Sequence, residues 1–134
     1  MRNQKKANGH FSGTIYKNDV PTSFIGESFY LYYDDRELQI YGGDEVSENR
    51  WSSITLSLTP NIVAGKHVLD NFSSFRSAMV VPAELDALQN YEGTLDITPD
   101  HTNRHYKGTL SLTAKNNSSD TYKIDATFDL QEST

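Results

Sequence analysis

The chain has 134 residues, no cysteine and a net charge of −6, and 11% of its residues are aromatic. This length predicts a single domain with a core of its own, while the absence of cysteine excludes disulfides, thiolate metal sites and cysteine nucleophiles. The excess of acidic residues disfavours general binding to nucleic acid or to a membrane surface, because both of those partners are themselves negatively charged.

Basic residues gather near the N-terminus, where residues 2–6 hold three of the twelve Lys and Arg. No apolar run anchors this segment, so we predict a disordered basic tail over residues 1–9 and a single β domain over residues 10–131. The segment is not an intact signal peptide. We therefore expect a cytoplasmic protein if this is the full-length chain, and an exported one if a signal segment has been removed. No apolar run reaches the roughly 18–20 residues of a membrane helix, so no membrane insertion is predicted.

Apolar and polar residues alternate with a period of two along most of the chain, which predicts β-strands with one buried face. The first predicted strand covers residues 11–16 and ends at an Asn-Asp turn. The second covers residues 22–33, and the third covers residues 38–41, where two glycines end it. The second strand has two faces, one with Ile25, Phe29, Leu31 and Tyr33 and the other with Phe24, Tyr30 and Tyr32.

The middle of the chain is less regular. We predict a polar loop over residues 44–50, a strand over 51–58 and shorter strands over 65–70 and 75–81. Residues 82–90 are the one helical candidate, with a proline at the first-turn position and two turns at most, and an irregular loop is the equal alternative. The predicted inward side chains of the strand over residues 51–58 are Ile54, Leu56 and Leu58.

The last third has the clearest pattern. Residues 91–98 and 106–113 are near copies with the shared spelling Y-x-G-T-L-x-[IL]-T. A segment rich in turn formers separates them, so we predict neighbouring antiparallel strands of one hairpin. Residues 122–130 alternate again and complete a three-stranded meander. Together, eight or nine short strands predict an all-β, single-domain antiparallel β-sandwich, with an up-and-down, lipocalin-like β-barrel as the alternative.

The order of these elements resembles that of small bacterial β-domains of unassigned function, which are often carried on lipoproteins. The likeness covers most of residues 10–130 and lies in FSGTIYKN, SITLSL, AGKHVLD and the run GTLDIT…GTLSLTA…ATFDL. This chain departs from that pattern in lacking a lipobox cysteine. The resemblance implies a β fold and carries over no catalytic or ligand residue.

No catalytic motif stands out. The chain has no nucleophile elbow, no phosphate-binding loop and no dinucleotide-binding glycine pattern, so we predict neither an enzyme nor a cofactor. Asp100, His101 and His105 could hold a metal ion if their loop brought them together, and otherwise they are exposed loop residues. The acidic residues between positions 34 and 48 could bind Ca²⁺ but lack the EF-hand spacing, and turns use the same residue types. No metal site is therefore predicted.

Three tyrosines are the best binding candidates. Tyr30 and Tyr32 alternate with Phe29 and Leu31, and Tyr41 is out of phase with its apolar neighbours. If Phe29 and Leu31 face the core, the tyrosines form an outer aromatic patch, and tyrosine is favoured at interfaces because it offers a large rigid area and a hydroxyl. The alternative is ordinary cross-strand pairing on a wet sheet face.

The sequence thus predicts a non-enzymatic binding module that recognises another macromolecule. The contact would use the tyrosines or an exposed edge strand, and the acidic composition suits a protein partner with a basic surface. The alternative is a small barrel that binds an apolar ligand in a pocket lined by Phe24, Trp51, Met79 and the inward leucines. Nucleic acid is not an expected partner.

Overall fold

The computed structural model describes residues 4–47, 50–70, 76–81, 88–116 and 118–133. Within these ranges the chain forms ten strands and no helix, which confirms the predicted all-β class. The strands are β1 (Gln4–Lys17), β2 (Val20–Ile25), β3 (Ser28–Tyr33), β4 (Leu38–Ser47), β5 (Arg50–Leu58), β6 (Gly65–Asp70), β7 (Arg76–Val81), β8 (Leu88–Asp100), β9 (His105–Asn116) and β10 (Thr121–Glu132).

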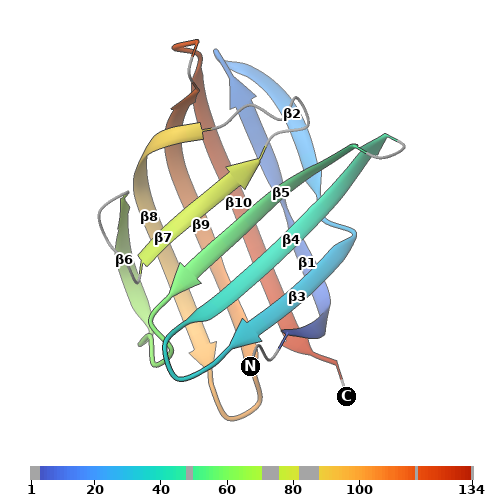
Figure 1. Cartoon of the computed structure of the whole chain (residues 1–134), viewed down its shortest axis with the longest axis vertical. Coiled ribbons are helices and arrows are strands. Elements are labelled where there is room, and N and C mark those ends of the chain that lie inside the picture. Colours follow the sequence, from blue (N-terminus) through green and yellow to red (C-terminus); the bar gives the residue numbers. More distant parts are fainter. Residues whose placement is uncertain (1–3, 48–49, 71–75, 82–87, 117, 134) are drawn as a thin grey trace.

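All strand pairs are antiparallel and join into one sheet with the order β6-β8-β9-β10-β1-β3-β4-β5-β7, with β2 beside β1. The sheet curls, so that β3, β4, β5 and β7 pass in front of β8, β9, β10 and β1 (Figure 1). Its two halves face each other as in a sandwich, but β1 belongs to both of them. The result is a half-barrel, which combines features of the sandwich and of the barrel alternative.

β1 joins the two halves because it bends. Residues 4–6 pair with β3, whereas residues 7–17 pair with β10. Near this change of partner, Gly9 has a φ of +137°, a conformation that residues with a side chain rarely adopt. Residues 4–9 therefore lie in a paired strand, unlike the disordered tail that we predicted over residues 1–9, and residues 1–3 lie outside the described ranges. Main-chain pairing of residues 4–6 with β3 and of residues 7–9 with β10, together with the burial of Ala7, takes the place of an apolar anchor.

The predicted strand over residues 22–33 is interrupted. The Gly26 N–H donates to the Phe11 carbonyl at 2.8 Å, and the Glu27 N–H donates to the Gly43 carbonyl at 2.7 Å. This break between β2 and β3 changes which alternate side chains point inward. Phe24 is 1% exposed and Ile25 is 62% exposed, so placing Ile25 on the face of the buried Leu31 was wrong.

β4 is longer than predicted. It passes through Gly42 and Gly43 to Ser47, so the predicted strand end was wrong. The predicted loop over residues 44–50 was wrong at residues 44–47 and 50, which lie in strands, and its residues 48–49 lie outside the described ranges. A Cβ on Gly42 would lie only 2.8 Å from the Phe11 ring. This glycine therefore makes room for a core side chain within a continuous strand. Of the helical candidate at residues 82–90, residues 82–87 lie outside the described ranges, and Leu88 already begins β8.

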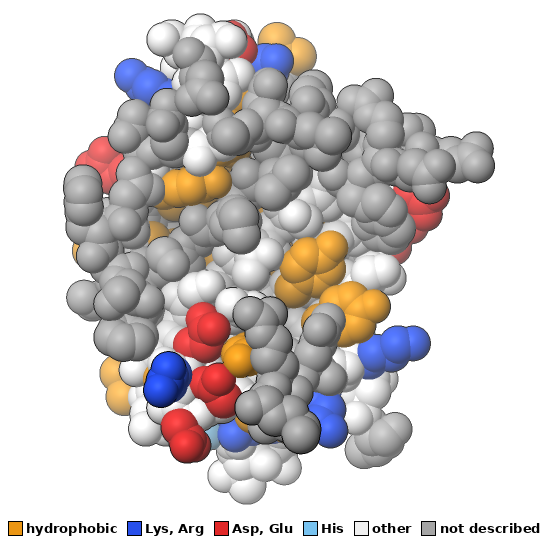
Figure 2. Space-filling view, in the orientation of Figure 1, with side chains coloured by type: hydrophobic (Ala, Val, Ile, Leu, Met, Phe, Trp, Pro, Cys, Tyr) orange, Lys and Arg blue, Asp and Glu red, His pale blue; other side chains and the backbone are white. Residues whose placement is uncertain are grey.

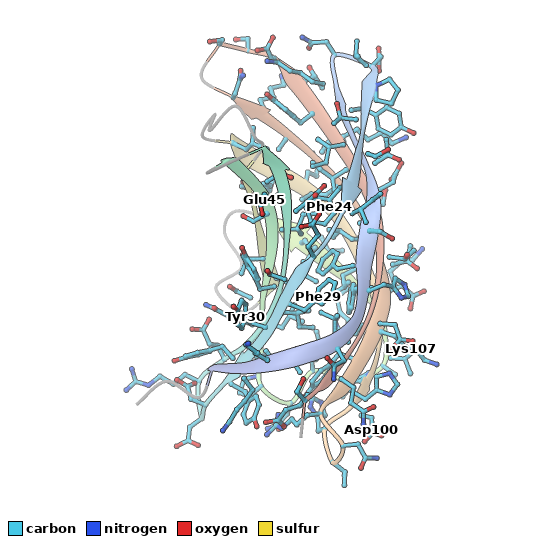
Figure 3. All side chains as sticks on the ribbon, turned by 90° about the vertical axis from the view of Figure 1, so that its right-hand side faces the viewer. Phe24, Phe29, Tyr30, Glu45, Asp100 and Lys107 are labelled. Atoms are coloured by element: carbon cyan, nitrogen blue, oxygen red, sulfur yellow. The ribbon has the colours of Figure 1, made fainter. Side chains whose placement is uncertain are left out.

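The core lies between the two halves of the sheet. Three phenylalanines from different strands meet there: the Phe11 ring centroid lies 5.9 Å from that of Phe24 and 5.2 Å from that of Phe128. Phe24 and Phe29 lie between the two layers in Figure 3. The predicted strand over 51–58 and the C-terminal meander are confirmed, with fully buried inner side chains that include Ile54, Leu56, Leu58, Leu95, Leu110, Ile124 and Leu130.

Candidate functional site

Two of the three candidate tyrosines meet on the outside of the sheet. Tyr30 of β3 is the direct cross-strand partner of Tyr41 of β4. Their ring centroids are 5.8 Å apart and the ring planes are inclined by 44°. Tyr30 points outward from β3, while its neighbour Phe29 points into the space between the layers (Figure 3). We call the outer surface around Tyr30 and Tyr41 the tyrosine face.

Tyr32 contributes little to this surface. It is 9% exposed, and its hydroxyl donates to Asp34 Oδ2 at 2.9 Å. It therefore supports the turn between β3 and β4. The predicted set of three tyrosines narrows to two that a partner could contact.

The Tyr41 side chain extends along its own strand toward Gly43. A Cβ on Gly43, two residues further along β4, would lie 2.5 Å from the Tyr41 hydroxyl oxygen. The ring therefore extends over Gly43, where only a glycine leaves room for it. Partial burial raises the pKa of Tyr41, with a smaller contribution from Tyr30. The Tyr41 hydroxyl is therefore neutral at physiological pH and can both donate and accept a hydrogen bond.

Most of the positions beside the two rings in the strand register hold polar residues. The strand register places Lys6 beyond Tyr30 and Thr55 beyond Tyr41, in one row across four strands. Figure 2 views this half of the sheet from outside and shows hydrophobic side chains gathered near its middle, with charged ones further out. The first row continues at Met79 of β7. The two neighbouring rows are Gln4, Tyr32, Gln39, Ser57 and Ser77 on one side and Ser28, Gly43, Ser53 and Val81 on the other.

A groove opens beside Tyr30. Its volume is about 330 Å³, and its walls include Lys6, Asn8, Glu27, Ser28 and Tyr30. It lies where β1 leaves β3 after Lys6 and bends at Gly9 toward β10. Tyr30 belongs both to this groove and to the tyrosine face, so the two form one continuous surface.

The residues considered for a metal site are kept apart by their own partners. Asp100 accepts from the Asn103 side-chain amide at 2.8 Å, and His105 contacts Asp129. His101 Nε2 lies 2.8 Å from the Ile62 carbonyl, and its Nδ1 lies 3.2 Å from the hydroxyl of Tyr106. Across the described part of the chain, no three His, Asp or Glu residues come close enough to hold a metal ion.

Sequence reasoning missed a polar cluster around Arg104. The guanidinium carbon of Arg104 lies 3.7 Å from the centroid of the Tyr33 ring, and Nη1 donates to the Tyr106 hydroxyl at 3.0 Å. The Tyr33 hydroxyl donates to Glu132 at 2.9 Å. These contacts tie the β8–β9 turn to β3 and to the end of β10. No sequence signal points to them, because they join residues far apart in the chain.

The pocket predicted for an apolar ligand is filled at Phe24, one of its predicted lining residues. The Phe24 ring packs edge-on against the Phe11 ring, and so it does not face an open space there. The side chains of Trp51 and Met79 lie outside the described part of the structure. The apolar-ligand hypothesis stays a prediction.

Stability at acid pH should depend on Asp34. Its carboxylate accepts hydrogen bonds from the backbone N–H groups of Arg36 and Glu37 and from the Tyr32 hydroxyl, and these bonds lower the pKa of Asp34 from its ordinary 3.8. The ionised form therefore stabilises the fold above the unfolded-state pKa, and this contribution is lost as the pH falls through the lowered value. We expect Asp34→Asn to lower the melting temperature at neutral pH and to flatten its decline from about pH 5 to about pH 2.

Circular dichroism melts at several pH values would measure this effect. The control is Asp35→Asn, the neighbouring substitution in the same turn, which should keep the wild-type pH profile. Parallel profiles for the wild type and both variants would contradict a stabilising role for the ionised Asp34.

Comparisons with known proteins identify no relative. No family model matches the chain, and no curated protein or solved structure matches it significantly. The resemblance to small bacterial β-domains therefore stays a prediction. In the described residues, no helix is long and apolar enough to cross a membrane.

Proposed function

We propose that this protein is a non-enzymatic binding module that recognises another macromolecule through its tyrosine face. The observation that carries the proposal is the contact between Tyr30 and Tyr41, which places two partly exposed aromatic rings side by side on a rigid sheet. Tyrosine is enriched among the residues that dominate binding energy, because its ring is large and loses little conformational entropy.

The open edge of β2 is a weaker candidate for the contact. Among the described strands, β2 pairs with β1 alone. Strand addition would need its outward N–H groups. Pro21 has no N–H, and the Ile25 N–H already donates to Asp44 Oδ2 at 2.9 Å. Proline and capping carboxylates are features that protect an edge from pairing, and so they favour the tyrosine face.

Partner retention by immobilised protein tests the proposal. The wild type is compared with the double variant Tyr30→Ser/Tyr41→Ser on an extract of the source organism, and retained molecules are identified by mass spectrometry. We expect the double variant to lose at least about 30-fold in affinity for a retained partner, as for the loss of an interface hot spot.

The matched control is Tyr16→Ser. Tyr16 is a partly exposed tyrosine of β1 whose ring lies 5.7 Å from Lys123 Nζ in the other half of the sheet. This variant should retain the partner as the wild type does. Equal retention by the wild type and the double variant would show that the tyrosine face is not the contact.

A further inference from the structure

We propose that a pocket at one end of the half-barrel binds a small zwitterion of the α-amino acid class through Arg104 and Asp35. The pocket lies where the β3–β4 turn, the β5–β6 connection and the β8–β9 turn come together (Figure 1), and neither Tyr30 nor Tyr41 lines it. The mouth of a barrel is a common place for ligand pockets. The volume is about 290 Å³, and the lining residues are Asp34, Asp35, Pro60, Asn61, His101 and Arg104.

The first step is the way in which Arg104 is held. Its guanidinium carbon lies 3.7 Å from the centroid of the Tyr33 ring, and Nη1 donates to the Tyr106 hydroxyl at 3.0 Å. Its main-chain carbonyl accepts from the Glu132 N–H at 3.0 Å. These contacts come from β3, β9 and β10, so the guanidinium is oriented before a ligand arrives. Such preorganisation lowers the entropic cost of binding.

The backbone of Arg104 points to the same role. Its φ is +49°, in the left-handed region that turns usually fill with glycine, asparagine or aspartate. Asn103, which would adopt this conformation more readily, lies one position earlier. Strained residues of this kind are concentrated at functional sites. The turn thus keeps an arginine where a smaller residue would be less strained, and this favours a role for its side chain.

The second step is that the charges of the pocket are not paired with each other. Among the described residues Arg104 forms no ion pair, although two carboxylates line the same pocket. One N–H of its guanidinium donates to Tyr106, and the others remain available for a ligand. The exposed Asp35 carboxylate has neither a hydrogen bond nor an ion pair within the described structure. The pocket therefore offers one cation and one anion to a ligand.

These two charges define the class of ligand. A guanidinium is a planar fork of donors that matches the two oxygens of a carboxylate. An ammonium group donates hydrogen bonds, which the Asp35 carboxylate accepts. A ligand with both groups would pair both charges, whereas Asp34 and Asp35 would repel a simple anion and Arg104 would repel a simple cation. Asp34 adds to the repulsion of anions, because the hydrogen bonds of its own turn lower its pKa and keep it ionised at neutral pH.

The third step is the size of the pocket and the nature of its other walls. A volume of about 290 Å³ lies at the lower end of the range of ligand pockets, roughly 300–1,000 Å³. The pocket therefore suits a molecule the size of a single amino acid. Asn61 adds an amide that both donates and accepts, while Pro60 is the one apolar lining residue. His101 contributes shape, because its ring nitrogens already contact the Ile62 carbonyl and the Tyr106 hydroxyl.

An NMR titration of the full, isotope-labelled chain tests the proposal. Glycine, alanine, serine and asparagine are added separately, and the shifts of the backbone amide signals locate the site. We expect at least one of these amino acids to bind with a Kd of about 1 mM or tighter. The amides of residues 34–36 and 101–104 should shift, while those of Tyr30 and Tyr41 should not.

Two derivatives of the amino acid that binds separate the contributions of its charges. The N-acetyl derivative keeps the carboxylate alone, and the amide derivative keeps the ammonium group alone. Each should bind about tenfold more weakly than the parent amino acid, because each leaves one charge of the pocket unpaired. Equal or tighter binding of either derivative, or of inorganic phosphate, would contradict a site for a zwitterion.

Three variants test the two side chains. Arg104→Lys keeps the charge but loses the planar fork, so it should weaken binding about tenfold. Asp35→Asn removes an exposed carboxylate without a partner, and should weaken binding several-fold at an unchanged melting temperature. The matched control is Arg36→Gln, which removes an exposed arginine of the same turn that does not line the pocket, and it should bind as the wild type does. Wild-type affinity in Asp35→Asn, or the absence of a saturable shift with every amino acid tested, would overturn the inference.

Discussion

Replacing Phe11 with alanine should lower the free energy of unfolding by about 3–5 kcal/mol, the usual cost of removing a buried phenylalanine. Phe11 is fully buried and contacts the rings of Phe24 and Phe128. It also packs against Gly42 of β4, in the opposite half of the sheet. The side chain thus fills space between both halves, and few neighbours could move to close the cavity it would leave. Urea denaturation followed by tyrosine fluorescence would measure the loss.

A double-mutant cycle with Gly42 would show that the contact between the two halves of the sheet is responsible for part of this loss of stability. Gly42→Ala places a Cβ 2.8 Å from the Phe11 ring and should be destabilising by about 1–3 kcal/mol. Phe11→Leu removes the ring, so Gly42→Ala should cost clearly less in that background. Additive losses would mean that Gly42 is needed for a reason other than room for Phe11.

Alternation along the sequence was sufficient to predict the strands that keep the same neighbouring strand on each side and the same inward face along their length. On β5, β9 and β10, Leu56, Leu110 and Ile124 are all buried, as the period of two predicts. It was insufficient at Gly26, where the strand breaks and changes the alternation, and at Gly42, where a glycine lies inside a strand. In both cases the decisive contact is with Phe11, a residue far away in sequence, and no local pattern reveals it.

The candidate site, like the fold, was predictable from the sequence only where it depends on local alternation. Alternation placed Tyr30 and Tyr41 outside, but their contact depends on the register of β3 and β4. The turn at Asp34, whose carboxylate accepts two backbone N–H groups, helps to set that register. The burial of Tyr32 and the groove beside Tyr30 had no sequence signal, because both depend on how β1 crosses the end of β3.

The bend in β1 leads to the last prediction, in which Gly9→Ala destabilises the fold and weakens the site together. Gly9 has a φ of +137°, and a Cβ there would overlap the carbonyl oxygen of Asp129 on β10. Gly65 is a matched control, because its φ is +130° but nothing lies within 4 Å of the corresponding Cβ position. Both substitutions incur conformational strain of the order of 1–3 kcal/mol. Only Gly9→Ala also forces neighbouring backbone apart. Its free energy of unfolding should therefore fall by about 1–3 kcal/mol more than that of Gly65→Ala.

The same comparison connects the fold to binding at the tyrosine face. If β1 relieves the overlap by straightening, the groove where it leaves β3 changes shape, and Lys6 and Asn8 move relative to Tyr30. Among folded molecules, Gly9→Ala should then bind the partner of the tyrosine face several-fold more weakly than the wild type, while Gly65→Ala binds equally well. Denaturation curves give the stability of each variant, and titration at a temperature where both are folded gives the affinity. Equal losses of stability in the two variants would mean that the backbone can absorb the overlap, and unchanged affinity in Gly9→Ala would mean that the bend does not shape the site.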